Sequence, residues 1–532
     1  MSCSKIFSGD FPELIYEIIK YFQNDYSTLY SCILVNRLWC RLTIPLLWEN
    51  PFSIPTENYN YNFIEIYSHN SYKFRTKLKE YRIINNLLPS NTLFNYLSYL
   101  KYLNTCKFIT SIKKWFCTVI GISNPNELDI IGLIDICVSL FKIFIENEVN
   151  LHTLEIEVSH VIEESTHLNN ILELIIQNPD FVRNIRNLKL YVVYNINISL
   201  IKDRISQIIN SHQNLKKVFL GYNNLPIYQS LLLSEDYNCS NSLNTIILYR
   251  VNFKDLINLR NIFEQLHVLE SVHIVYCSSL NAEFIQQIIT LPKPFKLRSF
   301  FINEMSQIES LQMLLQKSGE YLENFGYGFE FVSLEKKHLL LELITKYCKN
   351  IKFLDMCGND DQIVYSILNL IGNIKRNLNY LSISTCGLIW DDYYSSSYGN
   401  AECSSIILQN LGQTLPSELE YLYLSLHHIK VSDFEIFLEN SQDTFIKKLV
   451  IHYKESQDIL PSIKEYIMKK KRVRYLAISE PSFETSFYNF NLYGKELISL
   501  EDEVREFELY NIKVQSYYSS VINVFNFVKE IE

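Results

Sequence analysis

The sequence predicts an α/β solenoid, with parallel strands inside and helices outside, behind a small all-helical N-terminal domain. Three observations support this prediction. A six-residue apolar motif recurs thirteen times after residue 150, helical segments lie between its copies, and three short apolar helices are predicted in the first 50 residues. The expected divisions are the helical domain (1–50), a mostly helical junction (51–150), the repeats (151–514) and a C-terminal capping helix (515–532).

Composition limits the classes of function that the chain can have. Of its 532 residues 48% are hydrophobic, which is typical of a folded chain, and the formal net charge is -9. This acidic balance disfavours nucleic acids and anionic membranes as partners, because both attract basic proteins. The N-terminus lacks the uninterrupted apolar run of a signal peptide, so we expect a cytoplasmic or nuclear protein.

The cysteines and histidines do not form a pattern that predicts a metal site. The chain has 12 cysteines but no C-x-x-C pair, and we expect these thiols to be reduced and buried. His427 and His428 have no partners at metal-ligand spacing. The chain also lacks G-x-S-x-G, H-E-x-x-H and G-x-G-x-x-G, so we expect no enzymatic activity and no cofactor.

The first predicted helix is FPELIYEIIKYF, which runs from Phe11 to Phe22. Its apolar residues at i, i+3, i+4, i+7 and i+11 form one stripe of a helix. Pro12 fits the first turn, where a missing N–H costs nothing, and Asp10 followed by Glu13 has the form of a capping box. The segment is therefore a helix with a strongly apolar face.

Two more apolar helical segments follow, DYSTLYSCILVNRLWCRL and a stretch that ends in PLLWENPF. A three-helix unit of about 50 residues has a poor ratio of core to surface, so it cannot cover all of these side chains itself. Two interpretations remain open. The surplus apolar surface binds a partner protein, or the helices cap the rest of the chain.

This N-terminal stretch resembles an F-box. The family pattern is Leu-Pro-x-Glu-Leu, a helix, then Val-x-Arg-x-Trp and a closing Leu-Trp. Phe11 replaces the first Leu, a mild departure that should still fill an apolar pocket. The corresponding residues are Pro12, Glu13, Leu14, Val35, Asn36, Arg37, Trp39, Leu47 and Trp48, but Glu13 follows Pro12 directly where the pattern has one residue between them. The resemblance covers residues 6–50 of the 532-residue chain.

The resemblance implies a partner for the surplus apolar surface. F-box proteins dock through this unit onto the Skp-type adaptor of SCF ubiquitin ligases, the adaptor joins them to a cullin scaffold, and the remaining chain holds the substrate. Carried over to this sequence, the resemblance implies adaptor contacts from Phe11, Pro12, Leu14, Ile18, Leu34, Val35 and Trp39.

Residues 51–150 are predicted to be helical with interruptions. The most apolar stretch, IIGLIDICVSLFKIFI at 130–145, contains Asp135 and Lys142 and is too short to span a membrane, so we expect a buried helix. IKKWFC at 112–117 is a candidate for a degenerate first repeat.

The repeated motif has the form apolar-x-x-apolar-x-apolar, and ten of its twelve intervals are 25 to 31 residues long. Intervening segments such as NNILELIIQN and DQIVYSILNLIG each fit about three helical turns. Alternating strands and helices build a parallel sheet through right-handed crossovers. The copies are LHTLEI (151), IRNLKL (185), LKKVFL (215), LNTIIL (243), LESVHI (269), LRSFFI (297), LENFGY (322), IKFLDM (351), LNYLSI (378), LEYLYL (419), IKKLVI (446), VRYLAI (473) and VREFEL (504).

These units resemble leucine-rich repeats, which have one strand and one helix per unit and a period in the twenties. That family places Asn or Cys eight residues after the first apolar position. Only four of the thirteen copies do so here, so we expect an irregular solenoid; the four residues are Asn223, Cys277, Asn359 and Cys386. WDDYYSSSYGN at 390–400, in the longest interval, is predicted to be a surface loop.

The end of the chain, QSYYSSVINVFNFVKEIE, is predicted to be a helix that caps the last repeat. A solenoid needs such a cap because the apolar side of its last unit would otherwise face water. The apolar residues at helical spacing are Tyr518, Val521, Ile522, Phe525 and Val528.

Aromatic residues recur on the predicted inner face of the strands. Alternate residues of a strand point to one face, so the second and fourth positions after the first motif residue should face inward. Such rings suit protein binding, because they bury a large area with few rotors to order. We expect substrate contacts from Phe301, Phe353, Tyr380, Tyr421, Tyr423 and Tyr475. In the alternative interpretation the rings pack against each other or under the tail. Glu155 and Glu157 suggest an acidic end of this face.

Together these observations predict a non-enzymatic substrate receptor of an SCF-type ubiquitin ligase, with an unidentified protein target. Two alternatives remain. One is an F-box protein that delivers nothing for degradation, and the other is a repeat scaffold or inhibitor that ignores the adaptor.

KKKR at 469–472 is either a nuclear import patch or a solvated helix end, and we favour the helix end.

Overall fold

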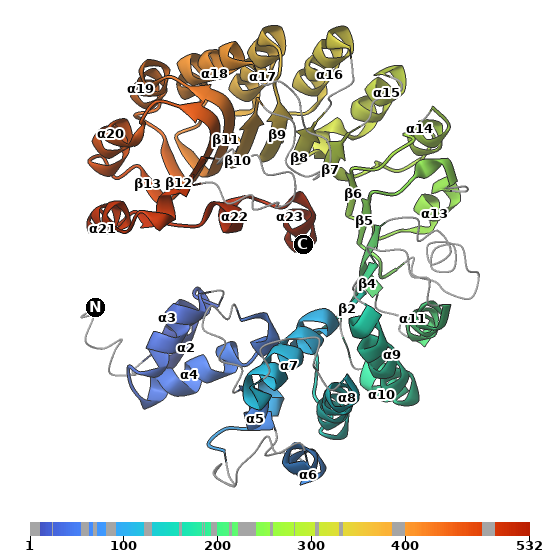
Figure 1. The fold of residues 1–532 in the computed structure, drawn as a ribbon. Coiled ribbons are helices and arrows are strands. Elements are labelled where there is room, and N and C mark those ends of the chain that lie inside the picture. Colours follow the sequence, from blue (N-terminus) through green and yellow to red (C-terminus); the bar gives the residue numbers. More distant parts are fainter. Residues whose placement is uncertain are drawn as a thin grey trace. The chain divides into compact units, whose positions relative to one another are not determined.

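The computed structural model divides the chain into two compact units, Met1–Ile246 with Leu266–Val268 and Ile247–Gln265 with Leu269–Glu532. Figure 1 shows the elements of both units. The structure describes residues 11–23, 25–54, 63–67, 72–80, 92–121, 130–158, 162–183, 185, 187–192, 199–211, 215–221, 241–255, 259–280, 282–303, 308–328, 333–385, 400–480 and 495–531.

The first unit begins with a three-helix bundle of α2 (Pro12–Lys20), α3 (Tyr26–Ile33) and α4 (Arg37–Leu47). Asp25 caps α3 by accepting the Thr28 N–H at 3.1 Å, and Asn36 caps α4 by accepting the Trp39 N–H at 3.0 Å. Pro12 lies in the first turn of α2, as predicted, whereas Asp10 of the expected capping box lies outside the described residues. The bundle core is formed by Ile15, Ile19, Leu29, Cys32, Trp39 and Leu46.

The segment after the bundle contains both helices and the first strand. Its elements are η1 (Pro51–Ser53), α5 (Phe63–Tyr67), α6 (Tyr72–Glu80), η3 (Tyr96–Tyr99), β1 (Tyr102–Asn104), α7 (Thr105–Ile120) and α8 (Ile130–Glu146). The prediction for 130–145 is confirmed, because α8 buries Leu140, Phe141 and Phe144, and Asp135 pairs with Lys77 at 3.1 Å. IKKWFC lies inside α7, so its assignment as a repeat strand is wrong; the first strand is β1.

The bundle is joined to this segment by packing and by polar contacts. The Trp48 ring lies 4.2 Å from the Tyr96 ring, centroid to centroid. The Glu49 carbonyl accepts the backbone N–H groups of Lys101 and Tyr102, at 3.0 and 3.1 Å. The Glu49 carboxylate also pairs with the Lys101 ammonium at 2.9 Å, which raises the pKa of Lys101. The end of α4 is thereby held against the start of β1.

Strand and helix alternate through the rest of the first unit. Neighbouring strands β1–β2, β2–β3 and β3–β4 pair in parallel, as the crossover rule predicts. These elements are β2 (Thr153–Val158), α9 (Ile162–Gln177), α10 (Pro179–Arg183), β3 (Asn187–Val192), α11 (Ser199–Ser211) and β4 (Leu215–Gly221). The strand β5 (Thr245–Tyr249) crosses the division between the two units.

The second unit continues the same order with parallel pairing from β6 to β13. Its strands form the inner row of the unit in Figure 1 and its helices the outer row. The strands are β6 (Ser271–Val275), β7 (Leu297–Ile302), β8 (Asn324–Tyr327), β9 (Phe353–Cys357), β10 (Tyr380–Ser384), β11 (Glu418–Ile429), β12 (Phe445–Ser456) and β13 (Val473–Glu480).

The helices of the second unit agree with the predicted helical segments, and two further ones, α15 and α18, were not predicted. They are η5 (Phe253–Asp255), α13 (Leu259–Gln265), α14 (Ala282–Ile289), α15 (Ile308–Ser318), η6 (Gly319–Tyr321), α16 (Leu334–Tyr347), α17 (Asp361–Ile374), α18 (Ala401–Thr414), α19 (Val431–Asn440), α20 (Leu460–Ile463) and η7 (Lys464–Met468). None of the described helices is long and apolar enough to cross a bilayer.

Twelve of the thirteen motif copies contribute strands, which confirms the repeated α/β organisation. The last copy, VREFEL, is wrong as a strand because it lies in α21 (Glu501–Leu509). Three acidic residues in the first turn of α21 favour a helix there, since they interact well with the positive end of the helix dipole. The loop predicted at 390–400 lies outside the described residues, except for Asn400, which caps α18.

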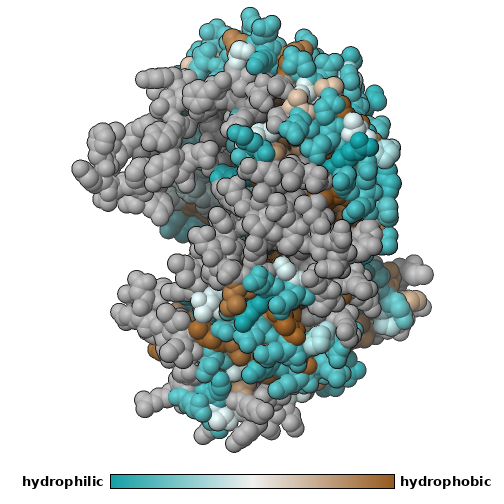
Figure 2. All heavy atoms as spheres, turned by 90° about the vertical axis from the view of Figure 1, so that its right-hand side faces the viewer, coloured by the Kyte–Doolittle hydropathy of each residue, from teal (hydrophilic) through white to brown (hydrophobic). Residues whose placement is uncertain are grey.

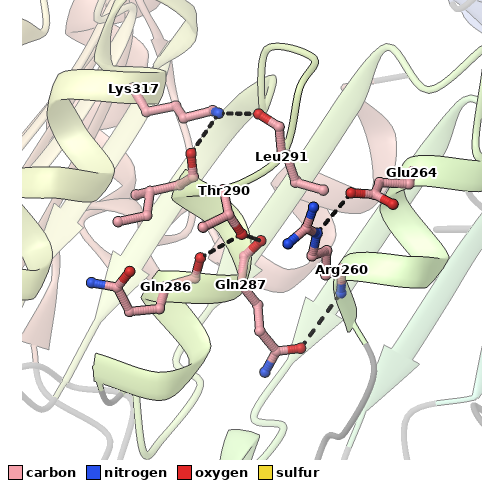
Figure 3. A network of polar contacts seen from close by, with 8 residues as sticks. Arg260, Glu264, Gln286, Gln287, Thr290, Leu291 and Lys317 are labelled. Carbon is pink, nitrogen blue, oxygen red and sulfur yellow. Dashed lines mark hydrogen bonds and ion pairs between the residues drawn. The ribbon is translucent and has the colours of Figure 1, made fainter.

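Polar contacts connect the outer ends of neighbouring repeats, as Figure 3 shows for α13, α14 and α15. The Lys317 ammonium donates to the backbone carbonyls of Ile289 and Leu291 at the end of α14. Arg260 pairs with Glu264 at 2.7 Å, and its backbone N–H donates to the Gln287 side chain. The outer surface of the helices in the upper part of Figure 2 is mainly hydrophilic. These polar contacts therefore link neighbouring repeats, and Lys317 also pairs with backbone carbonyls at the end of α14.

The last part of the chain differs from the single capping helix that was predicted. After β14 (Lys495–Glu496), η8 (Leu497–Ser499) and α21, the short strand β15 (Lys513–Val514) pairs in parallel with β13. Two short helices follow, α22 (Tyr517–Ser520) and α23 (Val524–Glu530), in place of one. Both lie on the inner side of the strands, opposite the outer helices (Figure 1). We call residues 515–530 the C-terminal strap.

Candidate binding surfaces

The N-terminal bundle carries an unusual density of exposed apolar side chains. Among the described residues, seven of the twenty large hydrophobic side chains that are exposed lie between residues 11 and 35. On α2 the predicted stripe is divided: Ile15 packs in the core together with Ile19, whereas Leu14 and Ile18 are exposed. The predicted adaptor residues that are exposed are Phe11, Leu14, Ile18, Leu34 and Val35; Pro12 is half-buried.

Trp39 is the exception among the predicted adaptor residues. Only 9% of it is exposed, and it packs in the bundle core with Ile15 and Leu29. The expectation that its side chain is presented to a partner is therefore corrected. The cause is the packing of α4 against α2 and α3, which turns the indole of Trp39 into the bundle core.

The sequence interpretation missed two exposed tyrosines on the same bundle. Tyr21, at the end of α2, is 86% exposed, and Tyr30 on α3 is 64% exposed. Tyrosine is enriched in protein interfaces because it combines a large apolar ring with a polar tip. The helical spacing of Tyr30 relative to the buried Leu29 and Cys32 was the available signal, since it places Tyr30 off the core stripe.

The second candidate surface is the inner face of strands β7 to β13. The strand register places Phe353, Tyr380, Tyr421 and Tyr475 in one row, which Lys448 interrupts. Phe301 and Tyr423 lie in the adjacent row, separated by Gly326, Asp355 and Ser382. The rows touch between Phe301 and Phe353, whose ring centroids are 5.7 Å apart. The structure therefore brings the six predicted residues onto one face, in two rows.

Most of these rings are not open to solvent. Phe301, Phe353, Tyr421 and Tyr423 are 0 to 6% exposed, whereas Tyr380 and Tyr475 are half-buried. The expectation that all six rings are open to a substrate is therefore wrong for the four buried ones. The alternative interpretation, in which the rings pack under the tail, describes Phe353, Tyr421 and Tyr423 in this structure, because the C-terminal strap covers them.

The strap contacts the inner face through its aromatic and apolar side chains. The Phe527 ring lies 4.6 Å from the Phe353 ring and 5.4 Å from the Tyr380 ring. The hydroxyls of Tyr517 and Tyr423 are 3.0 Å apart, and the Ile522 N–H donates to the Tyr421 hydroxyl at 3.3 Å. Within the strap, Tyr517, Val524 and Val528 are buried.

Ionisable groups are buried together with this face. Burial raises the pKa of the Asp355 carboxyl to about 6, although the Ser382 hydroxyl donates to it at 2.5 Å and acts in the opposite direction. Burial also raises the pKa of Tyr423. Burial lowers the pKa of His452 to about 4, and the His452 ring stacks on Tyr517 at 5.2 Å. A carboxyl and an imidazole near the strap thus have pKa values shifted in opposite directions.

Comparisons with known proteins leave the family undetermined. No protein-family model matches the chain, and the comparison with curated proteins found no match. Among solved structures, the leucine-rich repeat-containing protein LegL7 from Legionella pneumophila is similar at 10% identity and a TM-score of 0.29, over 70% of this chain and 93% of that one. We base neither the fold nor the function on a similarity this low.

Two of the four residues at the Asn or Cys position of the repeats can be placed. The Cys277 thiol donates to the Leu248 carbonyl at 3.3 Å and so satisfies the backbone of the preceding repeat. Asn359 accepts from the ammonium of Lys337 at 3.3 Å, and burial lowers the pKa of Lys337. Asn223 and Cys386 lie outside the described residues.

Glu155 and Glu157, from which an acidic end was predicted, have polar partners on the neighbouring strands. The Asn104 amide donates to both carboxylates, at 3.0 and 2.8 Å. The Lys189 ammonium pairs with Glu155 at 3.3 Å. These groups form a mixed polar row on β1 to β3 rather than an acidic patch.

The basic run KKKR ends in a structural arginine. Lys469, Lys470 and Lys471 are exposed, but Arg472 is 9% exposed and donates to the carbonyls of Leu438, Ser441 and Tyr466. Leu438 and Ser441 lie at the C-terminus of α19, so Arg472 satisfies carbonyls that the helix leaves unpaired. Within the described part of the chain, no group of three or more His, Cys, Asp or Glu side chains could hold a metal ion.

Proposed function

We propose that this protein is a substrate receptor of an SCF-type ubiquitin ligase, with the N-terminal bundle acting as an F-box. The bundle would bind a Skp-type adaptor, and the adaptor would join it to a cullin scaffold. The repeats would hold a protein target, and ubiquitin transfer would be carried out by other subunits. The gain in rate would come from proximity, because a bound target reaches a high effective concentration at the ligase.

The exposed apolar face of the bundle is the observation that carries this proposal. Leu34 is 73% exposed, Val35 is 50% exposed and Leu14 is 45% exposed, although the bundle has a complete core of its own. Soluble proteins seldom leave apolar side chains this concentrated unless a partner covers them. Leu14 and Val35 lie at positions of the F-box pattern and Leu34 lies beside them, so the adaptor is the partner that the sequence favours.

Adaptor binding can be tested with a double substitution that spares the core. Leu14→Asp with Leu34→Asp places two charges on the exposed face, and binding would have to bury them without partners. We expect the full-length variant to bind a purified Skp-type adaptor at least tenfold more weakly than the parent, measured by calorimetry. Leu509→Asp is the matched control, because Leu509 is 81% exposed and lies on α21, far along the chain from the bundle.

The outcomes of this experiment separate the hypotheses. A parent chain that does not bind the adaptor contradicts the F-box assignment. Equal binding by the parent and the double variant would mean that another surface holds the adaptor. Circular dichroism of the double variant should match the parent, since neither leucine belongs to the bundle core.

The alternative is a repeat scaffold or inhibitor with no role in degradation. The same double variant distinguishes it in cells. If the protein is a receptor, its captured partners should become more abundant when the adaptor face is disrupted, because they are no longer degraded. Unchanged abundance of every captured partner would favour the scaffold or a structural F-box protein.

A further inference from the structure

The C-terminal strap lies where a solenoid would otherwise offer its inner face to a ligand. It leaves the sheet at β15, where Lys513 pairs with Tyr475 and Val514 with Leu476. From there it continues as α22 and α23 on the inner side of the strands (Figure 1). We call the six aromatic residues of this face, which lie in two rows, the aromatic column; they are Phe301, Phe353, Tyr380, Tyr421, Tyr423 and Tyr475. Its Phe525 ring contacts Tyr249 of β5, with centroids 5.1 Å apart.

The strap differs in composition from the rest of the chain. Residues 515–528, QSYYSSVINVFNFV, contain no Asp, Glu, Lys or Arg, whereas 20% of the whole chain is charged. Four of these fourteen residues are Tyr or Phe. The segment therefore has the chemistry that suits a surface of buried and half-buried rings, namely aromatic and apolar side chains with neutral polar groups between them.

The strap contacts side chains of the repeats, and the strands beneath it pair with one another independently of it. Residues of β9, β10, β11 and β12 hydrogen-bond in unbroken parallel register. The strap's own helices have four and seven residues, too few to be stable without the surface they rest on. Detachment would thus remove contacts at the inner face and leave the sheet and the outer helices in place.

The fit of the strap is incomplete. Val521, Ile522, Phe525 and Phe527 remain half-buried, and Tyr518 is 53% exposed. Its polar contacts with the face are few, since the Ile522 N–H donates to the Tyr421 hydroxyl and the Tyr423 hydroxyl meets that of Tyr517. A covering segment with partly exposed rings is held less firmly than a core element.

We propose that the C-terminal strap is an internal ligand of a peptide-binding surface, and that target segments of the same chemistry bind the aromatic column after displacing it. Such a segment would span about the length of residues 515–528, would be uncharged over that length, and would place Tyr or Phe side chains where Tyr517, Phe525 and Phe527 lie. The proposal deepens the receptor half of the proposed function and is independent of adaptor binding.

The test supplies the strap as a separate peptide. A chain that ends at Val514 should bind a fluorescent peptide of residues 515–532, whereas the full-length chain should bind it at least tenfold more weakly because its own strap occupies the surface. The control peptide carries Tyr517→Ser, Phe525→Ser and Phe527→Ser and should not bind the shortened chain. Fluorescence anisotropy gives the affinities. Adaptor binding is measured in parallel, so failure of this proposal is distinguished from failure of the F-box assignment.

Two results would overturn the proposal. One is a shortened chain that keeps the circular dichroism of the parent and does not bind the peptide, and the other is equal peptide binding by the full-length and shortened chains. If the shortened chain does not fold, hydrogen exchange of the full-length chain decides. Amides of α22 and α23 should exchange at least tenfold faster than those of β10 and β11 at the same pH, and exchange of all four elements at one rate contradicts a displaceable strap.

Discussion

Gly326 shows how a single missing side chain sets the packing of the inner face. It lies on β8 beside Phe301, and a Cβ atom at this position would be 2.2 Å from the Phe301 Cδ1 atom. Phe301 is fully buried and also contacts Tyr276 and Phe353, so it has little room to move. Glycine is therefore required by its neighbour, and its backbone angles play no part in this requirement.

Gly326→Ala should consequently lower the free energy of unfolding by about 1–3 kcal/mol, the range for overpacking a core. Gly372→Ala is the matched control, because Gly372 lies in α17 with no atom within 4 Å of the added Cβ. The control should be neutral or stabilising by up to about 1 kcal/mol, as expected for Gly to Ala in a helix. Urea unfolding followed by circular dichroism measures both, and equal midpoints for the two variants would contradict this account.

Asp355 makes the stability of the second unit depend on pH. Burial raises the pKa of its carboxyl to about 6 in the folded state, so the folded state holds this proton more tightly than the unfolded chain. The stabilisation from the protonated form is therefore largest at acid pH and is lost as the pH rises through about 6. Above that value a buried carboxylate remains, with the Ser382 hydroxyl as its donor.

Asp355→Asn should remove this penalty and keep an oxygen that can accept from Ser382. We expect the variant to be more stable than the parent by about 1–3 kcal/mol at pH 8, with the difference shrinking toward pH 4. In the variant, stability should then fall between pH 6.5 and 4, because His452 has a pKa lowered to about 4 and resists protonation in the folded state. Urea titrations at several pH values test this.

The three-helix bundle shows which parts of an element a sequence pattern can assign. Helical spacing placed Pro12 in the first turn of α2, and the structure agrees. The same spacing put Leu14, Ile15 and Ile18 on one stripe, yet Ile15 is buried while Leu14 and Ile18 are exposed. Only the F-box resemblance assigned Leu14 and Ile18 to a partner surface. Trp39 follows the same apolar pattern, but its direction depends on how α4 crosses the other two helices. That crossing is a tertiary feature, so spacing alone could not separate an interface tryptophan from a core tryptophan.

Trp39→Ala should therefore unfold the bundle instead of only weakening a contact with a partner. Loss of a large buried aromatic side chain costs about 3–5 kcal/mol, which a unit of three short helices can hardly tolerate. Limited proteolysis should cleave the variant within residues 11–50 while the repeats stay intact, and Val35→Ala, at an exposed position, should resist cleavage like the parent. If the Trp39→Ala chain resists cleavage as the parent does, the bundle does not depend on Trp39, and the structural role given to it here is contradicted.

The repeats show where local pattern succeeds and where it stops. Twelve motif copies predicted strands correctly because each has apolar residues that face one core. VREFEL has the same spacing, yet it follows the acidic cluster Glu501–Glu503 and forms a helix. The first strand, β1, was missed because it has only three residues and lacks the third apolar position of the motif.

At the scale of each unit, the sequence predicted the repeated architecture but not the path of the chain's end. The period of the motif carries the order of strands and helices, since each repeat packs mainly on its neighbours. The strap depends on contacts between residues far apart in sequence, such as Tyr423 with Tyr517 and Tyr421 with Ile522. No local period encodes such contacts. The predicted binding residues were therefore placed on the correct face, but the C-terminal strap that covers several of them was not predicted.

The position of α23 has a practical consequence for experiments on the whole molecule. Val528 is buried, and α23, the helix that contains it, lies on the inner side of the strands of the second unit. A fluorescent protein or epitope fused there would start inside the curve of the repeats, where it would crowd any incoming target or pull α23 away. Loss of partner capture by a C-terminally tagged chain would thus be an artefact of the label, and an untagged control would expose it.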